Sequence, residues 1–281
     1  MKLLQDPWRE DRLEQIMTGN VIKIASDATL YDAHKLMSEA QLSRLAVTSA
    51  NGKLHGMITQ RDIVRFLGRD KSERALEEII VKEIMSTPAI ELKPSNTLAD
   101  AASAMNKKGI SSVVIIGENE EVLGIVTKTD ICYHFSQEYS KLRVEDVMTR
   151  KVFTVRPTHS IFFVASLLAR QGISRVPVVD DETLRGIITL VDIAGSAVVM
   201  RPELLEGSDE LCRTVSTAKL RAMTASDIMK PNPITVRTEE PLTKAAKLMI
   251  EHRISGIPAV DSKKILHGIV TKTDIVRAIM Q

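Results

Sequence analysis

A short pattern occurs four times along this 281-residue chain, and it limits the possible folds more than any other feature. Four segments end alike: GMITQRDI at 56–63, GIVTKTDI at 124–131, GIITLVDI at 186–193 and GIVTKTDI at 268–275. In each copy, the aspartate of this ending lies 18 or 19 residues after a serine, and that serine lies 26 residues after a methionine. Such regular spacing indicates a chain built from repeated supersecondary units.

The apolar pattern within one copy predicts a β-α-β-β-α unit. In the third copy, the apolar run at 152–155 indicates a strand, and apolar residues over 161–168 recur with helical spacing. Gly172 follows that helix where a C-terminal cap is expected. Two β-rich runs lie between 176 and 189, and a last helix begins near Asp192. A unit of roughly 55–60 residues is marginal alone, so each copy is expected to pack against another.

The spacing between copies predicts how they pair. We assign the units to residues 13–70, 80–138, 144–200 and 224–281. The interval between the third and fourth copies has an excess at 194–226, which we interpret as an extended helical connector. Copies one and two should therefore form one module, and copies three and four another, in an α/β protein.

Composition excludes several classes of protein. The net charge is only +2, which implies no strong overall attraction to nucleic acid or to a membrane. No apolar run approaches a membrane span, and the N-terminal residues carry charges where a signal peptide needs an apolar stretch. The six histidines and two cysteines lack metal-ligand spacing. We expect a cytoplasmic protein with no metal site.

The sequence also lacks the usual signatures of catalysis. We find no G-x-G-x-x-G, no Walker-type loop, no H-E-x-x-H and no G-x-S-x-G. No nucleophile–base pair stands out, and the four copies leave no room for a catalytic domain. We therefore expect that the chain is not an enzyme and requires no cofactor.

The repeated endings do carry groups that suit a nucleotide. Without a glycine-rich loop, a nucleotide needs a carboxylate for its ribose hydroxyls, an apolar slot for the base and donors for phosphate. Each aspartate can accept two ribose hydroxyls, and the threonine three residues earlier sits at a predicted helix start, where an anion is favoured. Thr129 and Thr273 add hydroxyl donors. The four pairs are Thr59 with Asp62, Thr127 with Asp130, Thr189 with Asp192, and Thr271 with Asp274.

These residues also have a purely structural interpretation. Thr-x-x-Asp is a helix-capping box, and capping is compatible with ligand contact. Lys128 and Lys272, inside the two TKTD segments, are expected to face solvent. The glycines of the repeated endings are expected to serve turns and close packing.

The G-h-h-T-x-x-D ending, the h-S-R-h-P-V middle and the M-T-x-x-h opening, where h is apolar, resemble the cystathionine β-synthase (CBS) domain family. The resemblance covers nearly the whole chain apart from about the first dozen residues and 194–226. The four-copy arrangement is similar to the γ subunit of AMP-activated kinase and its stand-alone prokaryotic relatives. It implies two modules forming a flat disc and AMP, ADP or ATP bound between paired units, with S-adenosylmethionine and NAD-type ligands ranked lower.

The resemblance further implies composite clefts, in which the Thr/Asp pair of one copy faces the opening strand and middle serine of its partner. It places Ile22, Ile90, Phe153 and Ile234 on the opening strands and assigns them base contacts, and it assigns further ligand contacts to Ser43, Ser111, Ser174 and Ser255.

An arginine follows the middle serine only in the odd copies, at Arg44 and Arg175. Under cross-pairing, Arg44 joins Thr127, Thr129 and Asp130, and Arg175 joins Thr271, Thr273 and Asp274. We expect these two clefts to bind a nucleotide tightly, and the clefts of Asp62 and Asp192 to bind it more weakly. Arg61 either supplies a phosphate contact or fills its cleft. Alternatively, Arg44 and Arg175 are surface cations at the end of a strand.

Two functional hypotheses follow. The first is a non-catalytic, energy-sensing regulatory protein that binds adenine nucleotides and controls an unidentified protein partner, as a monomeric disc or a homodimer. The second is an interaction protein that docks on a large assembly, such as a ribosome or an enzyme complex, with nucleotide only structural. Residues 141–281 hold 21 basic and 16 acidic residues, which slightly favours the second hypothesis.

Overall fold

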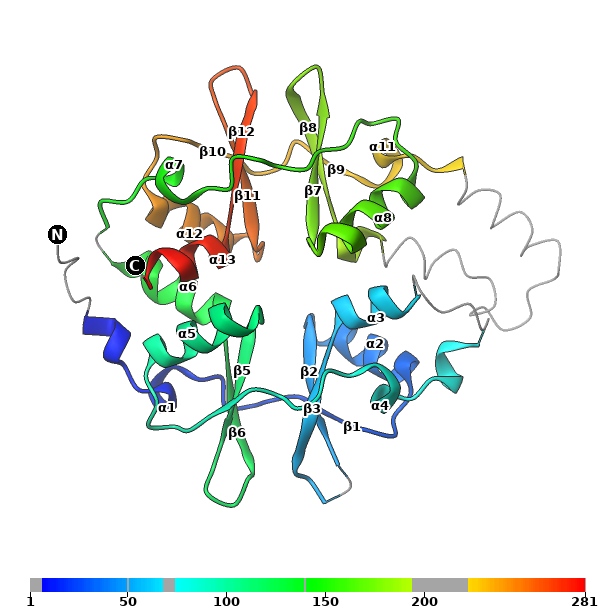
Figure 1. Ribbon diagram of the computed structural model, residues 1–281, viewed down its shortest axis with the longest axis vertical. Coiled ribbons are helices and arrows are strands. Elements are labelled where there is room, and N and C mark those ends of the chain that lie inside the picture. The colour runs from blue at the N-terminus through cyan, green and yellow to red at the C-terminus, as the bar shows by residue number, and fades with distance from the viewer. Residues whose placement is uncertain (1–6, 50, 68–73, 139, 194–221, 281) are drawn as a thin grey trace.

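The computed structural model describes residues 7–49, 51–67, 74–138, 140–193 and 222–280. Each copy builds one α/β unit around a three-stranded sheet (Figure 1). Among the described residues, no helix is long and apolar enough to cross a membrane. Residues 194–221 of the predicted connector lie outside this description, and the end of that segment belongs to the opening helix of the fourth copy.

The first two copies have nearly the same order of elements. After a short 3₁₀ helix, η1 (Pro7–Glu10), copy one contains α1 (Leu13–Ile16), β1 (Lys23–Ala25), α2 (Leu30–Glu39), β2 (Arg44–Thr48), β3 (Leu54–Thr59) and α3 (Gln60–Leu67). After η2 (Leu76–Glu78), copy two contains α4 (Val81–Ile84), β4 (Glu91–Leu92), α5 (Leu98–Lys108), β5 (Ser112–Ile116), β6 (Val122–Thr127) and α6 (Lys128–Gln137).

The other two copies follow the same plan with one difference in their strands. Copy three contains α7 (Val144–Val147), α8 (Ile161–Gln171), β7 (Arg175–Asp180), β8 (Thr183–Thr189) and a helical turn at 190–193. Copy four contains α11 (Ala225–Ile228), β9 (Lys230–Pro231), β10 (Val236–Arg237), α12 (Leu242–Glu251), β11 (Gly256–Val260), β12 (Leu266–Thr271) and α13 (Lys272–Ala278).

Local sequence explains most of these elements. In each copy the last two strands form an antiparallel hairpin, and in copies one, two and four the opening strand pairs with it in parallel. Thr29 and Thr97 cap α2 and α5 with complete capping boxes. Gly109 and Gly172 end α5 and α8 with φ of 64° and 63°, a left-handed conformation that glycine adopts without strain. The predicted glycine caps are confirmed.

The strand predicted at 152–155 is wrong. Only Val155 forms a parallel bridge, to Val178. The preceding backbone is committed elsewhere, because Thr149 pairs with Ile269 of the fourth copy and the Val152 N–H closes a turn on the Arg150 carbonyl. The third sheet instead receives β9 from the fourth copy, antiparallel to β8.

Paired copies exchange their opening helices. Leu13 of α1 is fully buried in the core that contains α5 of copy two, and Val81 of α4 is fully buried in the core of copy one. The second module repeats this exchange, with Val144 buried in the core of copy four and Ala225 in that of copy three. The predicted pairing of copies one with two and three with four is confirmed.

The glycine of each repeated ending permits the exchange. A Cβ at Gly124 would lie 2.5 Å from the Met17 sulfur, and one at Gly268 would lie 2.7 Å from that of Met148. At Gly56 the obstacle is the Ser86 carbonyl oxygen, at 2.6 Å. The opening methionine of one copy therefore rests directly on the last strand of its partner.

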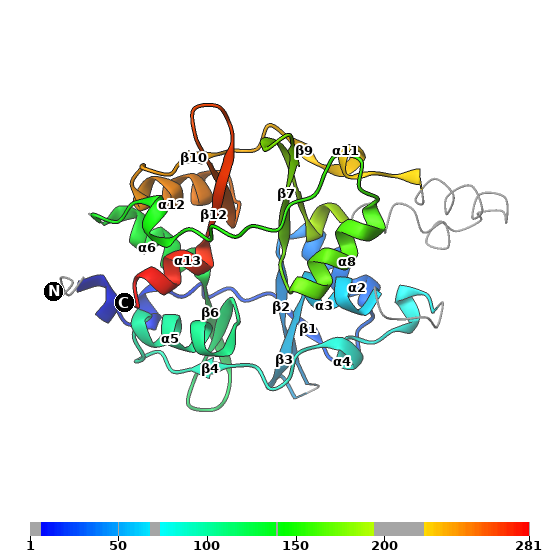
Figure 2. The same cartoon turned by 45° about the horizontal axis from the view of Figure 1, so that its top comes forward.

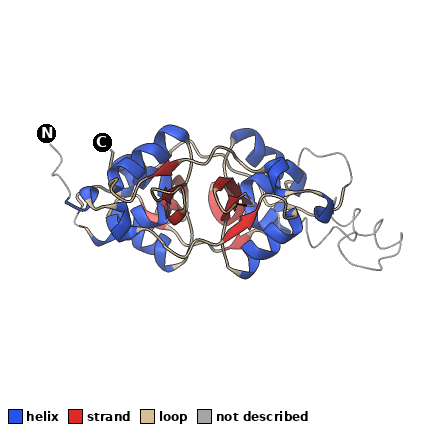
Figure 3. Cartoon of the chain, turned by 90° about the horizontal axis from the view of Figure 1, so that it is seen from below, coloured by secondary structure: helices blue, strands red, loops and turns tan. Residues whose placement is uncertain are grey.

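The two modules form a flattened body, broad in Figure 1 and thin in Figure 3. Helices α5 and α6 of copy two pack with α12 and α13 of copy four, and the two copies share one apolar core. The cores of copies one and three are separate from it and from each other. Their helices α2, α3 and α8 lie together at the other end of the disc (Figures 1 and 2).

The close approach at Gly56 predicts an effect on stability. Gly56→Ala should lower the free energy of unfolding by about 1–3 kcal/mol, because backbone must shift to admit the methyl group. Gly19→Ala is the matched control, since the added methyl group would meet only an ordinary contact at 3.9 Å. Urea denaturation measures both variants. Equal stability of the two would contradict the role given to Gly56.

Candidate functional site

The four Thr/Asp pairs have one geometry. In each, the Oδ2 atom of the aspartate accepts a hydrogen bond from the threonine N–H at 2.7–2.9 Å and another from the threonine hydroxyl at 2.6–2.9 Å. The structural interpretation as a helix cap is therefore correct. These bonds use only the Oδ2 atom of each aspartate. The cap alone therefore does not involve Oδ1, which in Asp192 is paired with Lys230.

Arg44 and Arg175 reach across to the partner copy of their own module. The Arg44 Nη1 donates to the Ser111 hydroxyl at 3.0 Å. Arg175 lies over Gly256, where a Cβ would come within 2.6 Å of its Nη1. Both arginines also donate to the serine that precedes them, Ser43 at 3.2 Å and Ser174 at 3.3 Å. These contacts make a role as free surface cations untenable.

The carboxylates of the even copies influence the pKa values of these two arginines. Desolvation lowers the pKa of Arg44, while the nearby charge of Asp130 raises it. Desolvation likewise lowers the pKa of Arg175 to about 10, and the charge of Asp274 opposes that shift. The charge of Asp130 therefore acts on Arg44, and that of Asp274 acts on Arg175, within the same module. The composition of the clefts stays a prediction.

The prediction that Lys128 and Lys272 face solvent is wrong. Lys272 is buried, with 7% of its surface exposed, and Lys128 is half-buried. The Lys128 Nζ donates to the Thr273 hydroxyl at 3.0 Å, and the Lys272 Nζ donates to the Thr129 hydroxyl at 2.9 Å. Docking of copy two on copy four turns each lysine toward the opposite module.

A positively charged cluster results at the meeting point of the modules. Its described members are Arg44, Arg61, Lys128, Arg175, Lys272 and Arg277, with Asp130 and Asp274 as opposing charges. Desolvation, followed by the charges of Arg277, Arg61 and Arg44, lowers the pKa of Lys128 to about 8. Desolvation also lowers the pKa of Lys272. We call these eight residues the central cluster.

The two remaining aspartates lie in different surroundings. Asp192 forms an ion pair of 3.4 Å with Lys230, which comes from β9 of the fourth copy. Asp62 sits beside Arg61, and the partner serine on its side, Ser111, already accepts a hydrogen bond from Arg44. Weaker binding at these two clefts stays a prediction.

The residues assigned to base contact differ in solvent exposure between the odd and the even copies. Ile22 and Phe153 of the odd copies are 38% and 46% exposed. Ile90 and Ile234 of the even copies are partly buried against the shared core. The assignment of these residues to strands is wrong: Ile22 and Ile90 immediately precede β1 and β4, Ile234 lies between β9 and β10, and Phe153 lies in no strand. The clefts expected to bind tightly thus have the more exposed apolar residue.

Sequence reasoning missed Lys128, Lys272, Arg277 and Lys230. A usable signal for the first two was present, because lysine follows the capping threonine in both even copies and in neither odd copy. Arg277 and Lys230 had no comparable signal.

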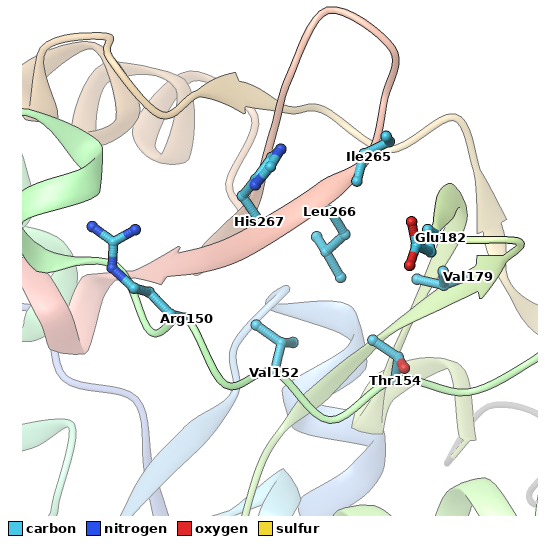
Figure 4. Close-up of a pocket in the computed structure, with 8 residues that line it drawn as sticks. All are labelled: Arg150, Val152, Thr154, Val179, Glu182, Ile265, Leu266 and His267. Carbon is cyan, nitrogen blue, oxygen red and sulfur yellow. The ribbon is translucent and has the colours of Figure 1, made fainter.

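A separate hollow of about 280 Å³ lies on the second module, between the 150–154 segment and the β11–β12 hairpin (Figure 4). It is lined by Arg150, Val152, Thr154, Val179, Glu182, Ile265, Leu266 and His267. None of these is a candidate site residue. Among the described residues, no group of three or more His, Cys, Asp or Glu is arranged to hold a metal ion.

One protein-family model matches all four copies. The model of the CBS domain matches four segments, at residues 13–69, 81–136, 144–198 and 225–281.

Individual relatives agree with that match along nearly the full length. The uncharacterized protein MJ1225 of Methanocaldococcus jannaschii is 29% identical over 273 residues, which cover 92% of this chain and 94% of that protein. Its crystal structure, described as that of a proposed archaeal homologue of γ-AMPK, superposes with a TM-score of 0.83 at 27% identity and covers 96% of this chain and 100% of that chain. An uncharacterized 33.4 kDa protein in the ribosomal RNA operon of Thermofilum pendens is 26% identical over 94% of this chain and 90% of its own length.

The lowered pKa of Lys128 predicts how stability depends on pH. Between its folded pKa of about 8 and the ordinary value of 10.5, the unfolded chain binds more protons at this lysine than the folded chain. The contribution of Lys128 to stability therefore rises with pH across that window. Wild type should therefore gain stability relative to Lys128→Met between about pH 7.5 and about pH 9.5.

Urea denaturation at the two pH values measures the difference. Lys107→Met, at an exposed lysine of α5, is the control and should keep a constant difference from wild type. A constant difference for Lys128→Met as well would show that its ammonium group is not desolvated.

Proposed function

Because the chain belongs to the CBS domain family, we propose that it is a non-catalytic regulatory protein that binds adenine nucleotides in clefts between paired copies. One observation supports this most strongly. In each module a partly buried arginine of the odd copy lies near a capped aspartate of the even copy, beside an exposed apolar residue. Phosphate, ribose and base each have a suitable group there.

The charge of the central cluster favours phosphate-bearing ligands. Six cations face two carboxylates among its described members. AMP, ADP and ATP bring negative charge into this region, whereas S-adenosylmethionine brings a sulfonium cation. Coulomb energy therefore ranks the adenine nucleotides above S-adenosylmethionine.

We propose energy sensing as the biological role. AMP, ADP and ATP share base and ribose and differ in phosphate charge, which is the property that the central cluster can distinguish. The description of the M. jannaschii protein as a proposed γ-AMPK homologue supports this role. The regulated partner is a protein that the disc contacts in the cytoplasm, and the disc acts as a monomer or a homodimer.

Nucleotide binding predicts stabilisation of the fold. A ligand that binds only the native state at about 100 times its dissociation constant adds roughly 2.7 kcal/mol per site. ATP, ADP or AMP at millimolar concentration should therefore raise the melting temperature, with no turnover of ATP. If these three nucleotides and S-adenosylmethionine all leave the melt unchanged, the proposed function is wrong.

The asymmetry of the clefts predicts different effects of three double variants. Arg44→Ala with Arg175→Ala should weaken nucleotide binding by roughly ten- to a hundredfold and adenosine binding much less, because a charge-assisted bond to phosphate contributes about 1.5–3 kcal/mol. Asp130→Ala with Asp274→Ala should weaken nucleotide and adenosine alike, because both ligands carry the ribose. Asp62→Ala with Asp192→Ala is the matched control and should largely spare tight binding.

Calorimetric titration of these variants with ADP and with adenosine measures the effects. Loss of tight binding in the Asp62/Asp192 variant, with tight binding kept in the Arg44/Arg175 variant, would overturn the cross-pairing of odd and even copies.

A further inference from the structure

The hollow between the 150–154 segment and the β11–β12 hairpin has an apolar lining drawn from three elements. Val152 belongs to the segment, Val179 to β7 and Leu266 to β12 (Figure 4). A second hollow of about 440 Å³ shares three of its lining residues and continues along the chain to His159. The two hollows together form one groove, and none of the four capped aspartates lines it.

A proline explains why the segment beside this groove is only partly paired with its own sheet. In copy two, the Val114 N–H donates to the Ile90 carbonyl at 3.0 Å and ties the opening segment to the middle strand. The corresponding residue of copy three is Pro177, which has no N–H group. The carbonyl of Phe153, which corresponds to Ile90, therefore lacks that donor. Among the described residues, no backbone hydrogen bond joins residues 150–154 to β7.

Opposite charges stand at the two ends of the first hollow. Arg150 and Glu182 are both exposed, and the apolar lining lies between them in Figure 4. The Arg150 Nη2 donates to the Glu145 carbonyl at 2.8 Å, which holds the guanidinium group in place. Glu182 follows two aspartates, in the turn between β7 and β8. A complementary occupant therefore carries an apolar side chain, with an acidic group at one end and a basic group at the other.

The same segment also carries a residue of a candidate nucleotide cleft. Val152 and Thr154 line the hollow, and Phe153 between them does not, because alternate side chains of an extended chain point to opposite sides. Phe153 is the residue expected to contact the base in the cleft of Arg175 and Asp274, and 46% of its surface is exposed. The hollow and that cleft therefore lie on opposite sides of one short segment.

Building on the proposed function, we propose that the regulated protein docks in this hollow through an extended segment of its chain. The groove continues past Glu182 into the second hollow, which suits an extended chain better than a small molecule. An apolar side chain of the partner lies against Val152 and Leu266, an acidic residue lies beside Arg150, and a basic residue lies beside Glu182.

The 150–154 segment then couples the nucleotide to the partner. A base in contact with Phe153 and a partner in contact with Val152 and Thr154 hold the same stretch of backbone, which β7 leaves unbonded. A nucleotide that shifts this stretch changes the shape of the hollow. By linkage, nucleotide and partner change each other's affinity by the same factor.

A synthetic peptide tests the docking in the full-length chain. The probe is acetyl-Glu-Thr-Leu-Thr-Lys-amide, about as long as the segment it lies along, at about 3.3 Å per extended residue. The controls are the peptides with Glu at both ends and with Lys at both ends. NMR titration of the isotope-labelled protein gives the dissociation constants. Wild type should bind the mixed-charge peptide about twofold to thirtyfold more tightly than either control, the range expected for exposed ion pairs.

Charge variants of the protein should change this order. Arg150→Glu should prefer the peptide with two lysines, and Glu182→Lys should prefer the peptide with two glutamates. Thr154→Trp should abolish binding of all three peptides, because the indole ring fills the hollow. Lys23→Trp, at the corresponding exposed position of copy one, is the matched control and should bind like wild type. Saturating ADP should change the dissociation constant of the mixed-charge peptide about fivefold or more in wild type.

The outcomes separate this proposal from the function on which it rests. If wild type binds no nucleotide but shows the expected order of peptides, the proposed function fails and the docking site stands. If the charge variants do not change the order, or Thr154→Trp binds the peptides like wild type, the docking site is wrong. If Thr154→Trp instead turns a dimer into a monomer in sedimentation, the hollow holds a second copy of this chain and the proposal is overturned. If ADP binds without changing peptide affinity, the coupling is wrong.

Discussion

The exchange of opening segments between paired copies is the contact on which the rest of this structure depends. Leu13, Val81, Val144 and Ala225 each complete a core that belongs to the partner copy, so the repeated unit of the sequence is not the unit that folds. The methionine after each opening helix can rest on the partner's last strand only because that strand has glycine at the contact. The same exchange fixes which copy faces which, and it thereby sets the pairing of Arg44 with the residues of copy two and of Arg175 with those of copy four.

Sequence reasoning succeeded where a feature is local or strictly periodic. The capping threonines, the glycines at 109 and 172, and the hairpins follow from short-range chemistry, and the unequal spacing of the copies was enough to pair them. It failed where distant segments compete for the same backbone or side chain. The 152–155 run has the composition of a strand, but the bridge of Thr149 to the fourth copy draws the segment away from the third sheet. The direction of Lys128 depends on a residue 145 positions away, and no local pattern encodes that contact.

Odd and even copies have different physical roles despite their similar folds. The even copies share one apolar core, and they carry both lysines and the buried Asp274. The odd copies have separate cores and supply Arg44, Arg61 and Arg175 to the central cluster. Burial of apolar surface holds the even copies together, while the like charges gathered between the modules oppose their approach. An anion bound between an odd and an even copy would remove part of that repulsion, so under the proposed function ligand binding and docking of the modules would favour each other.

Under the proposed function, the charge of the central cluster would also affect how two nucleotides bind together. The lysines span from one module to the other through single hydrogen bonds, so anions bound in both modules would be attracted by the same positive charges. The first anion is attracted by the full excess of positive charge. The second anion is attracted less strongly, because the first has neutralised part of that excess. Each added phosphate therefore lowers the attraction for the next one, and the fall is steeper for ATP than for AMP. Under the proposed function, a mixture of adenine nucleotides would therefore occupy the clefts according to the total phosphate charge of the bound ligands.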